Sequence, residues 1–303
     1  VIIAERQGEE NEPSFRLAEE VQAAAFRVHS YHHEVIGDLV DLQTIRPEQL
    51  YDHYRRNYRP GNAVLAIAGD FDSQDMLAKV CACFEPLEAA DLQPILTRPE
   101  PAQAGQRSVV VEGPGETTYL EAAYHAPQAN HPDFLALVVA DSLLSGPSDL
   151  SVFGGGLSNK TSRLYRALVE RELAVSVHGG LQATIDPYLY SLSLIIHPEV
   201  RPEAALETLD YEISRLQEQA PAQAELDRAI KQARALFAYS IESITSQAAR
   251  MGFTEMFADQ EWLDSYLERL SAVTPQEVQR VAQIYLRPQN RVIGTYLPTG
   301  GAE

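Results

Sequence analysis

The 303-residue sequence is poor in basic residues, in cysteine and in long apolar runs. Its 24 Lys and Arg stand against 43 Asp and Glu, for a formal net charge of −19. Nucleic-acid binding needs clustered cationic side chains, so this composition argues against that class of function. Cys81 and Cys83 would point to different faces of a helix, which disfavours a disulfide or a metal pair. The longest apolar run is interrupted by Asp141 and is too short to span a membrane.

Two stretches of the sequence resemble each other across a separation of 228 positions. PEQLYDHYRRNYRPGN begins at Pro47, and PQEVQRVAQIYLRPQN begins at Pro275. In both, proline suits the first turn of a helix, apolar residues recur at helical spacing, and a closing Arg-Pro ends the helix. A short apolar run follows each helix, at residues 63–71 and 291–297, and predicts a strand. A repeat this long indicates a duplicated domain, because the units of solenoid proteins are far shorter.

The repeat divides the chain into unequal parts. The second copy starts near Ser108, whereas a first copy of equal length would begin roughly 120 residues before Val1. We therefore expect an N-terminally truncated chain, with the C-terminal part of a first domain at residues 1–90. A linker rich in Pro and Ala is expected at 91–107 and a complete second domain at 108–303.

The predicted elements are mixed in order along the chain. Strands are expected at 108–113, 117–124, 175–182 and 188–197, and helices at 14–28, 131–145, 161–172, 202–218, 222–245 and 259–269. This order predicts an α+β fold in which each domain packs an antiparallel-rich sheet against helices, the first domain being incomplete.

Motif spacing alone identifies no catalytic residue. HSYHHE, at residues 29–34, fits neither HExxH nor the inverted HxxEH, which favours a solvated polar loop over a metal site. GGGLSNKTS approaches a phosphate-binding loop but has Asn159 in place of the second glycine, so nucleotide binding is the weaker alternative to a glycine loop that caps a helix. The acidic stretch that contains Glu5 is typical of a solvated helix end.

VIIAERQGEENEP, the repeated helix–turn–strand unit with its GDFD ending, and GGGLSNKTSRLYRALVERELAVSV together resemble the M16 peptidases. This family includes pitrilysin, insulin-degrading enzyme and mitochondrial processing peptidase, and the resemblance covers essentially the whole chain. It is strongest to the shorter bacterial members with two homologous domains. The resemblance implies a zinc-dependent endopeptidase, in which the two His of HxxEH and a distant Glu hold Zn²⁺ and the motif Glu is the general base.

The resemblance assigns the distant metal ligand to Glu5, which lies in VIIAE. HxxEH would then precede Val1, so the chain holds no catalytic residue and should be inactive alone. The position equivalent to Glu5 in the second copy is Ala233, which implies a non-catalytic second domain. Three glycines occupy the place of the metal motif there and are candidate substrate contacts: Gly154, Gly155 and Gly156.

Two positions depart from the family pattern, and the departure suggests a partner subunit. Many members carry an Arg and a nearby Tyr that reach the substrate backbone, where this chain has Val169 and Val175. We therefore expect the metal-bearing subunit of a dimer, whose homologous M16 partner supplies that pair to an enclosed peptide substrate. The alternative is a non-peptidase structural or partner subunit of the same fold. The bacterial periplasm and the cytoplasm both remain open as the compartment.

Overall fold

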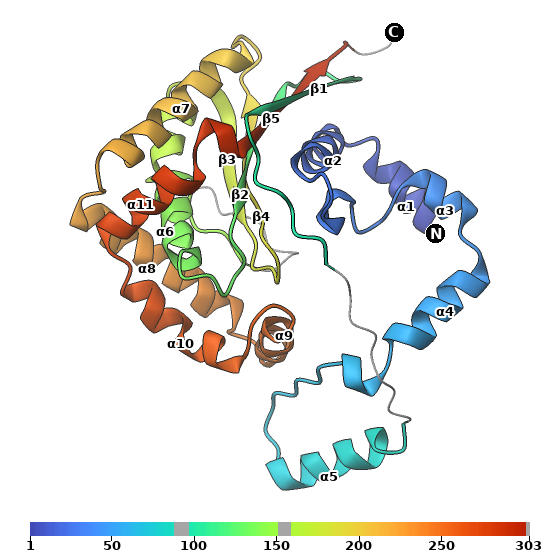
Figure 1. Ribbon diagram of the computed structural model, residues 1–303. Helices are drawn as coiled ribbons and strands as arrows, with labels where there is room; N and C mark the ends of the chain where they lie inside the picture. The colour runs from blue at the N-terminus through green and yellow to red at the C-terminus, as the bar shows by residue number, and fades with distance from the viewer. Residues whose placement is uncertain (88–96, 151–158, 301–303) are drawn as a thin grey trace.

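The computed structural model describes residues 1–87, 97–150 and 159–300. Figure 1 shows a sheet with a thick helical layer on one face, a single helix on the other, and an arm of helices that leads away from both. This arrangement confirms the predicted α+β class. No helix of the described residues is both long and apolar enough to cross a membrane.

The sheet has five strands in the order β1-β5-β2-β4-β3. Their bounds are β1 Arg107–Gly113, β2 Tyr119–Ala126, β3 Ala174–Leu181, β4 Tyr188–Ile196 and β5 Arg291–Pro298. Only the β1–β5 pair is parallel, and the other three pairs are antiparallel. All five strands lie within two residues of the positions expected from the sequence, because alternating apolar residues mark the two faces.

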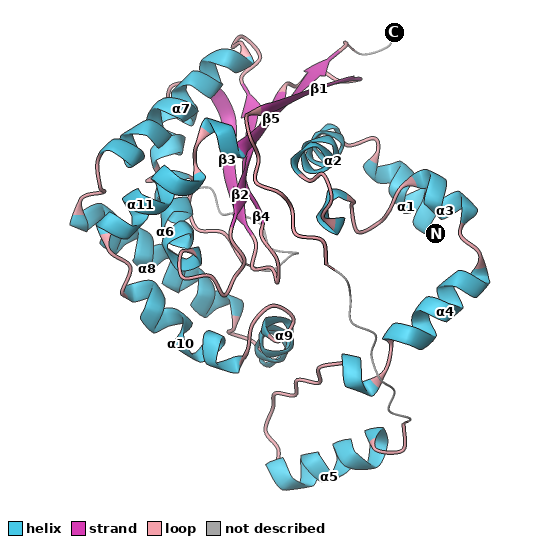
Figure 2. Cartoon of the chain, viewed as in Figure 1, coloured by secondary structure: helices cyan, strands magenta, loops and turns pink. Residues whose placement is uncertain are grey.

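The helical layer covers one face of the sheet (Figures 1 and 2). It contains α6 Phe134–Leu144, α7 Pro202–Glu218, α8 Gln223–Ser240, α10 Gln260–Ser271 and α11 Pro275–Tyr285, and α9 Ile244–Thr254 adjoins it. Every residue of α6 is buried, as expected for a helix that is apolar on all sides and lies at the centre of the layer.

The opposite face of the sheet is covered by α2, Pro13–Ala25, which comes from the first part of the chain. Its Leu17 and Val21 are buried against side chains of β1, β2, β4 and β5. A Cβ at Gly294 of β5 would lie 2.9 Å from Leu17 Cδ1 and closer still to Val21. The absence of a side chain at this one position therefore lets α2 approach the sheet.

The remaining elements of the first part form the arm. They are α1 Ile2–Glu9, α3 Leu39–Thr44, α4 Pro47–Asn57 and α5 Ser73–Phe84. No side chain of α3, α4 or α5 is buried. The strand expected at residues 63–71 is wrong for the described structure, in which this segment carries no strand. Strand hydrogen bonds form between neighbours, and no other described strand lies beside it.

The repeat noticed in the sequence is visible in the elements. Helix α4 is followed by the 3₁₀ turn Pro60–Asn62, and α11 is followed by the 3₁₀ turn Pro288–Asn290. Each boundary of the second pair lies 228 positions after the corresponding boundary of the first. Local sequence therefore sets the same helix bounds twice. Packing differs, because Leu50 and Tyr54 are 55% and 54% exposed whereas the equivalent Val278 and Ala282 are fully buried.

Two helix predictions are wrong in detail. The helix expected at 161–172 contains a short π-helix, Tyr165–Val169. The helix expected at 222–245 ends at Ser240, and a separate helix, α9, starts after Ser243. The Ser243 hydroxyl accepts the backbone N–H of Ser246, and this N-cap starts a new helix where a continuous one was expected.

Candidate functional site

The predicted metal ligand, Glu5, lies in the first turn of α1 with its side chain exposed. An exposed carboxylate can serve as one zinc ligand, but a site needs at least three. The described residues contain no group of three His, Cys, Asp or Glu arranged to hold a metal ion. Zn²⁺ would therefore need further ligands from beyond these residues, and the role of Glu5 stays a prediction.

The neighbouring Arg6 attaches α1 to α2. Arg6 is buried, and its guanidinium donates to Glu10 Oε1 at 3.1 Å and to Glu19 Oε2 at 2.8 Å. It also lies over the Phe15 ring, 5.2 Å from the centroid. Because α2 is itself fixed on the sheet, Arg6 fixes the direction in which α1 presents Glu5.

A carboxyl group that sequence analysis missed lies beneath these helices. Glu121 of β2 is 8% exposed, and burial raises its pKa, with nearby Glu34 acting in the same direction. Burial likewise raises the pKa of Glu34, and Glu19 adds to the effect. The signal in the sequence was a single acidic residue within the apolar strand YLEAAYHA, on the face opposite Leu120 and Ala122.

The predicted substrate-contact glycines, Gly154, Gly155 and Gly156, lie outside the described residues. The chain just before them is held by a buried carboxyl group. Asp141 of α6 accepts hydrogen bonds from the Ser145 hydroxyl, at 2.6 Å, and from the Ser148 hydroxyl. The backbone N–H of Ala183 donates to the Leu150 carbonyl at 3.0 Å. Asp141 therefore helps to fix the last turn before residues 151–158.

Asp141 predicts a pH dependence of stability. Burial raises its pKa from 3.8 to about 6, although the serine donors oppose this. Since the folded state holds the proton more tightly, the stabilisation is present below pH 3.8 and is lost as the pH rises towards 6. As the pH rises from 4 to 7, the free energy of unfolding of Asp141→Asn should therefore increase by about 3 kcal/mol relative to that of the unsubstituted protein. This follows from about 1.4 kcal/mol per pKa unit.

Denaturant unfolding at several pH values measures this difference. The exposed Asp227 is the matched control, and Asp227→Asn should follow the unsubstituted protein at every pH. Parallel curves for Asp141→Asn and the unsubstituted protein would contradict the assignment.

The two valines that replace the family's Arg and Tyr lie near one edge of the sheet. Val169 ends the π-helix and packs partly buried against the main core, and Val175 lies on edge strand β3 with 56% of its surface exposed. Neither side chain can hydrogen-bond a peptide backbone. Glu172 between them has a φ of +58°, an uncommon conformation for a residue with a side chain.

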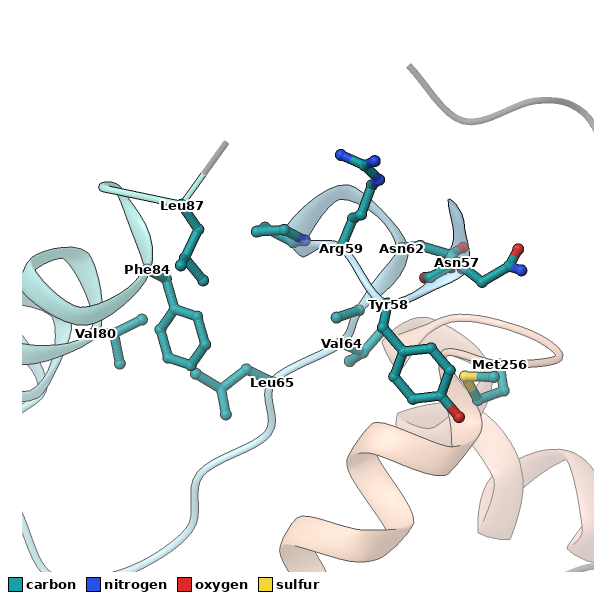
Figure 3. A pocket seen from close by; sticks show the side chains of 12 residues that line it. Asn57, Tyr58, Arg59, Asn62, Val64, Leu65, Val80, Phe84, Leu87 and Met256 are labelled. Atoms are coloured by element: carbon teal, nitrogen blue, oxygen red, sulfur yellow. Dashed lines mark hydrogen bonds between the residues drawn. The ribbon is translucent and has the colours of Figure 1, made fainter. Parts of the chain in front are cut away.

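A cavity of about 680 Å³ lies between residues 57–65, α5 and Met256. Figure 3 shows Leu65, Phe84 and Tyr58 around it. Its lining is mainly apolar and includes no His, Cys, Asp or Glu. This cavity therefore offers no carboxylate, imidazole or thiolate to a metal ion.

The HSYHHE stretch differs from the expected solvated loop. It contains a 3₁₀ turn, Ser30–His32, and His29 is only 3% exposed. His29 packs against Tyr31 with ring centroids 4.3 Å apart and against Phe26 at 5.9 Å. Aromatic packing, which the local pattern did not reveal, therefore buries this imidazole.

Solved structures share this fold. A crystal structure of a protease from Helicobacter pylori matches with a TM-score of 0.87 and 24% identity, over 98% of this chain and 70% of that one. The peptidase M16 inactive domain from Pseudomonas fluorescens matches with a TM-score of 0.84 and 19% identity, over 100% and 69% of the two chains. These likenesses show that the chain has the same α+β fold as these two structures.

The family model described as "Peptidase M16 inactive domain" matches residues 44–233. The chain belongs to the M16 peptidase family. Zinc protease PqqE of Helicobacter pylori is 26% identical over 267 residues, which are 87% of this chain and 57% of that protein. The mitochondrial-processing peptidase subunit beta of Lentinula edodes is 22% identical, over 94% of this chain and 62% of that protein. The chain thus spans less than two thirds of the length of these relatives.

Proposed function

We propose that the complete protein carrying this chain is a zinc-dependent endopeptidase. In this proposal residues 1–87 are the last part of a metal-bearing domain, Glu5 is one zinc ligand, and residues 108–300 form a non-catalytic domain. The repeat at a separation of 228 positions is the main support for the proposal. It makes α4 equivalent to α11, but the second copy has Ala233 at the position equivalent to Glu5. The family match and the zinc-protease names of relatives support it.

The exposed face of the arm supports a larger metal-bearing domain. Leu50 and Tyr54 on α4 occupy the positions that Val278 and Ala282 occupy on α11, where α6 and α7 cover them. Burying a side chain of this size stabilises a fold by about 1.5–3 kcal/mol. We infer that equivalent helices cover this face in the complete protein.

Zinc with an open coordination position lowers the pKa of a bound water towards neutrality. In this proposal the residues of this chain orient one zinc ligand and enclose the substrate. Arg6 holds the helix that presents Glu5, and the second domain confines an extended peptide. A peptide bound as an added strand would gain backbone hydrogen bonds with little demand on its side chains. Gly154, Gly155 and Gly156 are proposed contacts of this peptide.

The partner proposal rests on Val169 and Val175, which cannot replace Arg and Tyr. We expect the complete protein, purified alone, to bind zinc but to cleave a fluorogenic peptide slowly. Adding a homologous M16 subunit that carries the Arg and Tyr should raise kcat/KM by about 100-fold or more, the effect typical of losing one transition-state donor. Full activity of the single chain, unchanged by the added subunit, would contradict the heterodimer and leave the peptidase in place.

A second candidate is a non-peptidase partner subunit of the same fold. The observation in its favour is that the matching family model describes an inactive domain, and this match begins within the first part of the chain. Metal analysis separates the two candidates. One zinc per complete protein supports the peptidase, whereas purification without zinc from zinc-supplemented medium supports the partner subunit.

A further inference from the structure

A cavity of about 240 Å³ lies where five stretches of the chain meet. His29 follows α2, Glu100 and Gln103 precede β1, and His125 and Asp186 lie at the end of β2 and in the turn before β4. None of these residues belongs to the candidate metal site. The cavity therefore needs an explanation of its own.

One wall of the cavity carries a fixed negative charge. Glu100 accepts the backbone N–H groups of Arg27, Val28 and His29 at 2.8, 2.9 and 3.1 Å. Burial by itself would raise the pKa of Glu100, but these three donors hold that pKa below its ordinary value. The carboxylate is therefore ionised at neutral pH.

Three buried polar atoms of the lining have no hydrogen-bond partner within the described residues: His29 Nε2, His125 Nε2 and Gln103 Oε1. The amide nitrogen of Gln103 donates to the carbonyl oxygens of Gly105 at 2.9 Å and of Arg291 at 2.7 Å, so only its oxygen remains to be satisfied. Buried polar atoms normally have partners, and three exceptions around one cavity indicate a site for water or for a polar ligand.

The neutral tautomer of His29 follows from its contacts. Its Nδ1 accepts the backbone N–H of Tyr31 at 3.1 Å, so the ring proton is on Nε2. That nitrogen lies 3.4 Å from Asp186 Oδ2 but makes no hydrogen bond with it. The Asp186 carboxylate therefore remains available to a ligand.

His125 presents a lone pair to the cavity. Burial holds its pKa below the ordinary value; Glu100 and a hydrogen bond to the Ala25 carbonyl oppose this, and Arg107 acts with burial. A neutral imidazole has one nitrogen with a free lone pair, and Nε2 has no hydrogen-bond partner within the described residues. Nε2 is therefore able to accept a hydrogen bond from a ligand.

The lining thus combines two neutral acceptors, His125 Nε2 and Gln103 Oε1, with the carboxylates of Glu100 and Asp186. No Lys or Arg lines the cavity, so an anion is disfavoured. No group of described His, Cys, Asp and Glu is arranged for a metal ion. The other walls include three prolines and an alanine, which suit an aliphatic stem: Pro99, Pro101, Ala102 and Pro187.

We propose that this cavity binds an ammonium group on a short aliphatic chain, because buried acceptors and carboxylates converge in it beside apolar walls. An ammonium group has three donors and no acceptor, which matches the unsatisfied Nε2 of His125, the Oε1 of Gln103 and the Asp186 carboxylate. The source is either a free alkylamine or the lysine side chain of a peptide. Both present the same terminal chemistry.

Titration calorimetry of the complete protein tests the proposal with n-butylamine and with n-butanol, a neutral molecule of the same shape. Butylamine should bind in about the millimolar range expected of so small a ligand. Butanol should bind at least about tenfold more weakly, since it has no charge-assisted hydrogen bonds. Nα-acetyl-lysine amide distinguishes the two sources. If it competes with butylamine, the ligand is the lysine side chain of a peptide; if it does not compete, the ligand is a free alkylamine.

Asp186→Asn keeps the size of the side chain and removes its charge. Butylamine affinity should fall at least about tenfold, as for a lost hydrogen bond to a charged group. Asp52→Asn, at an exposed carboxylate of α4 outside the lining, should bind as the unsubstituted protein does. Circular dichroism confirms that each variant is folded. Equal binding of butylamine and butanol, absence of amine binding, or unchanged affinity in folded Asp186→Asn would each overturn the proposal.

Discussion

Glu5→Gln in the complete protein should abolish stoichiometric zinc binding and lower peptide cleavage by at least about 100-fold. An amide oxygen is a much weaker zinc ligand than a carboxylate, and even supporting residues around zinc sites change affinity by about 10–100-fold. The substitution leaves the fold intact, because the Glu5 side chain is exposed and Arg6, not Glu5, attaches α1 to α2. Metal analysis and kcat/KM measured on the same preparation give the result.

Glu12→Gln is the matched control for Glu5→Gln. Glu12 is an exposed carboxylate seven positions further on, immediately before α2, and it makes no side-chain cap hydrogen bond. Zinc content and activity should both be unchanged. If Glu5→Gln kept one tightly bound zinc and full activity, Glu5 would not be a ligand, and the alignment of α1 with the family's metal-binding helix would be wrong.

Gly179→Ala should destabilise the fold by about 3 kcal/mol, at the upper end for overpacking a core. A Cβ at this position of β3 would overlap the Asp141 carboxylate and the Ser145 hydroxyl. Both groups are buried, so the methyl group would displace a carboxyl from its hydrogen bonds in addition to straining the strand. The free energy of unfolding from urea denaturation measures the loss.

The adjacent Gly180 provides a control in the same strand. A Cβ there would meet no atom within 4 Å, so Gly180→Ala should be neutral or slightly stabilising. Equal stability of the two variants would mean that the close contact of β3 with Asp141 is not maintained in solution.

The sequence predicts the five strands well because alternation over a half-buried sheet is a local signal. It predicts α4 and α11 equally well, since proline and the apolar period set both ends of each helix. It fails at residues 63–71, where strand formation depends on a neighbour that sequence alone does not place. The break between α8 and α9 was missed because one serine cap outweighed a continuous helical pattern.

The site residues also differ in how far the sequence alone could predict them. Glu5 could be proposed only through family resemblance, because nothing in its spacing distinguishes it from a solvated helix end. The cavity of His29, Glu100 and His125 could not be predicted, since it joins segments that are far apart in the sequence. Glu121 and Asp141 left a weak signal as single acids inside apolar elements, but burial and pKa follow only from the packing around them.

The packing of α2 on the sheet limits how the two parts of the chain can move relative to each other. This helix precedes the expected linker in sequence, yet it shares one core with β1, β2, β4 and β5, and Gly294 keeps it in contact. A rotation centred on residues 91–107 would have to pull α2 off the strands. Any movement of α3, α4 and α5 relative to the sheet would therefore leave α2, and the residues 27–29 that Glu100 holds, in place on the strands.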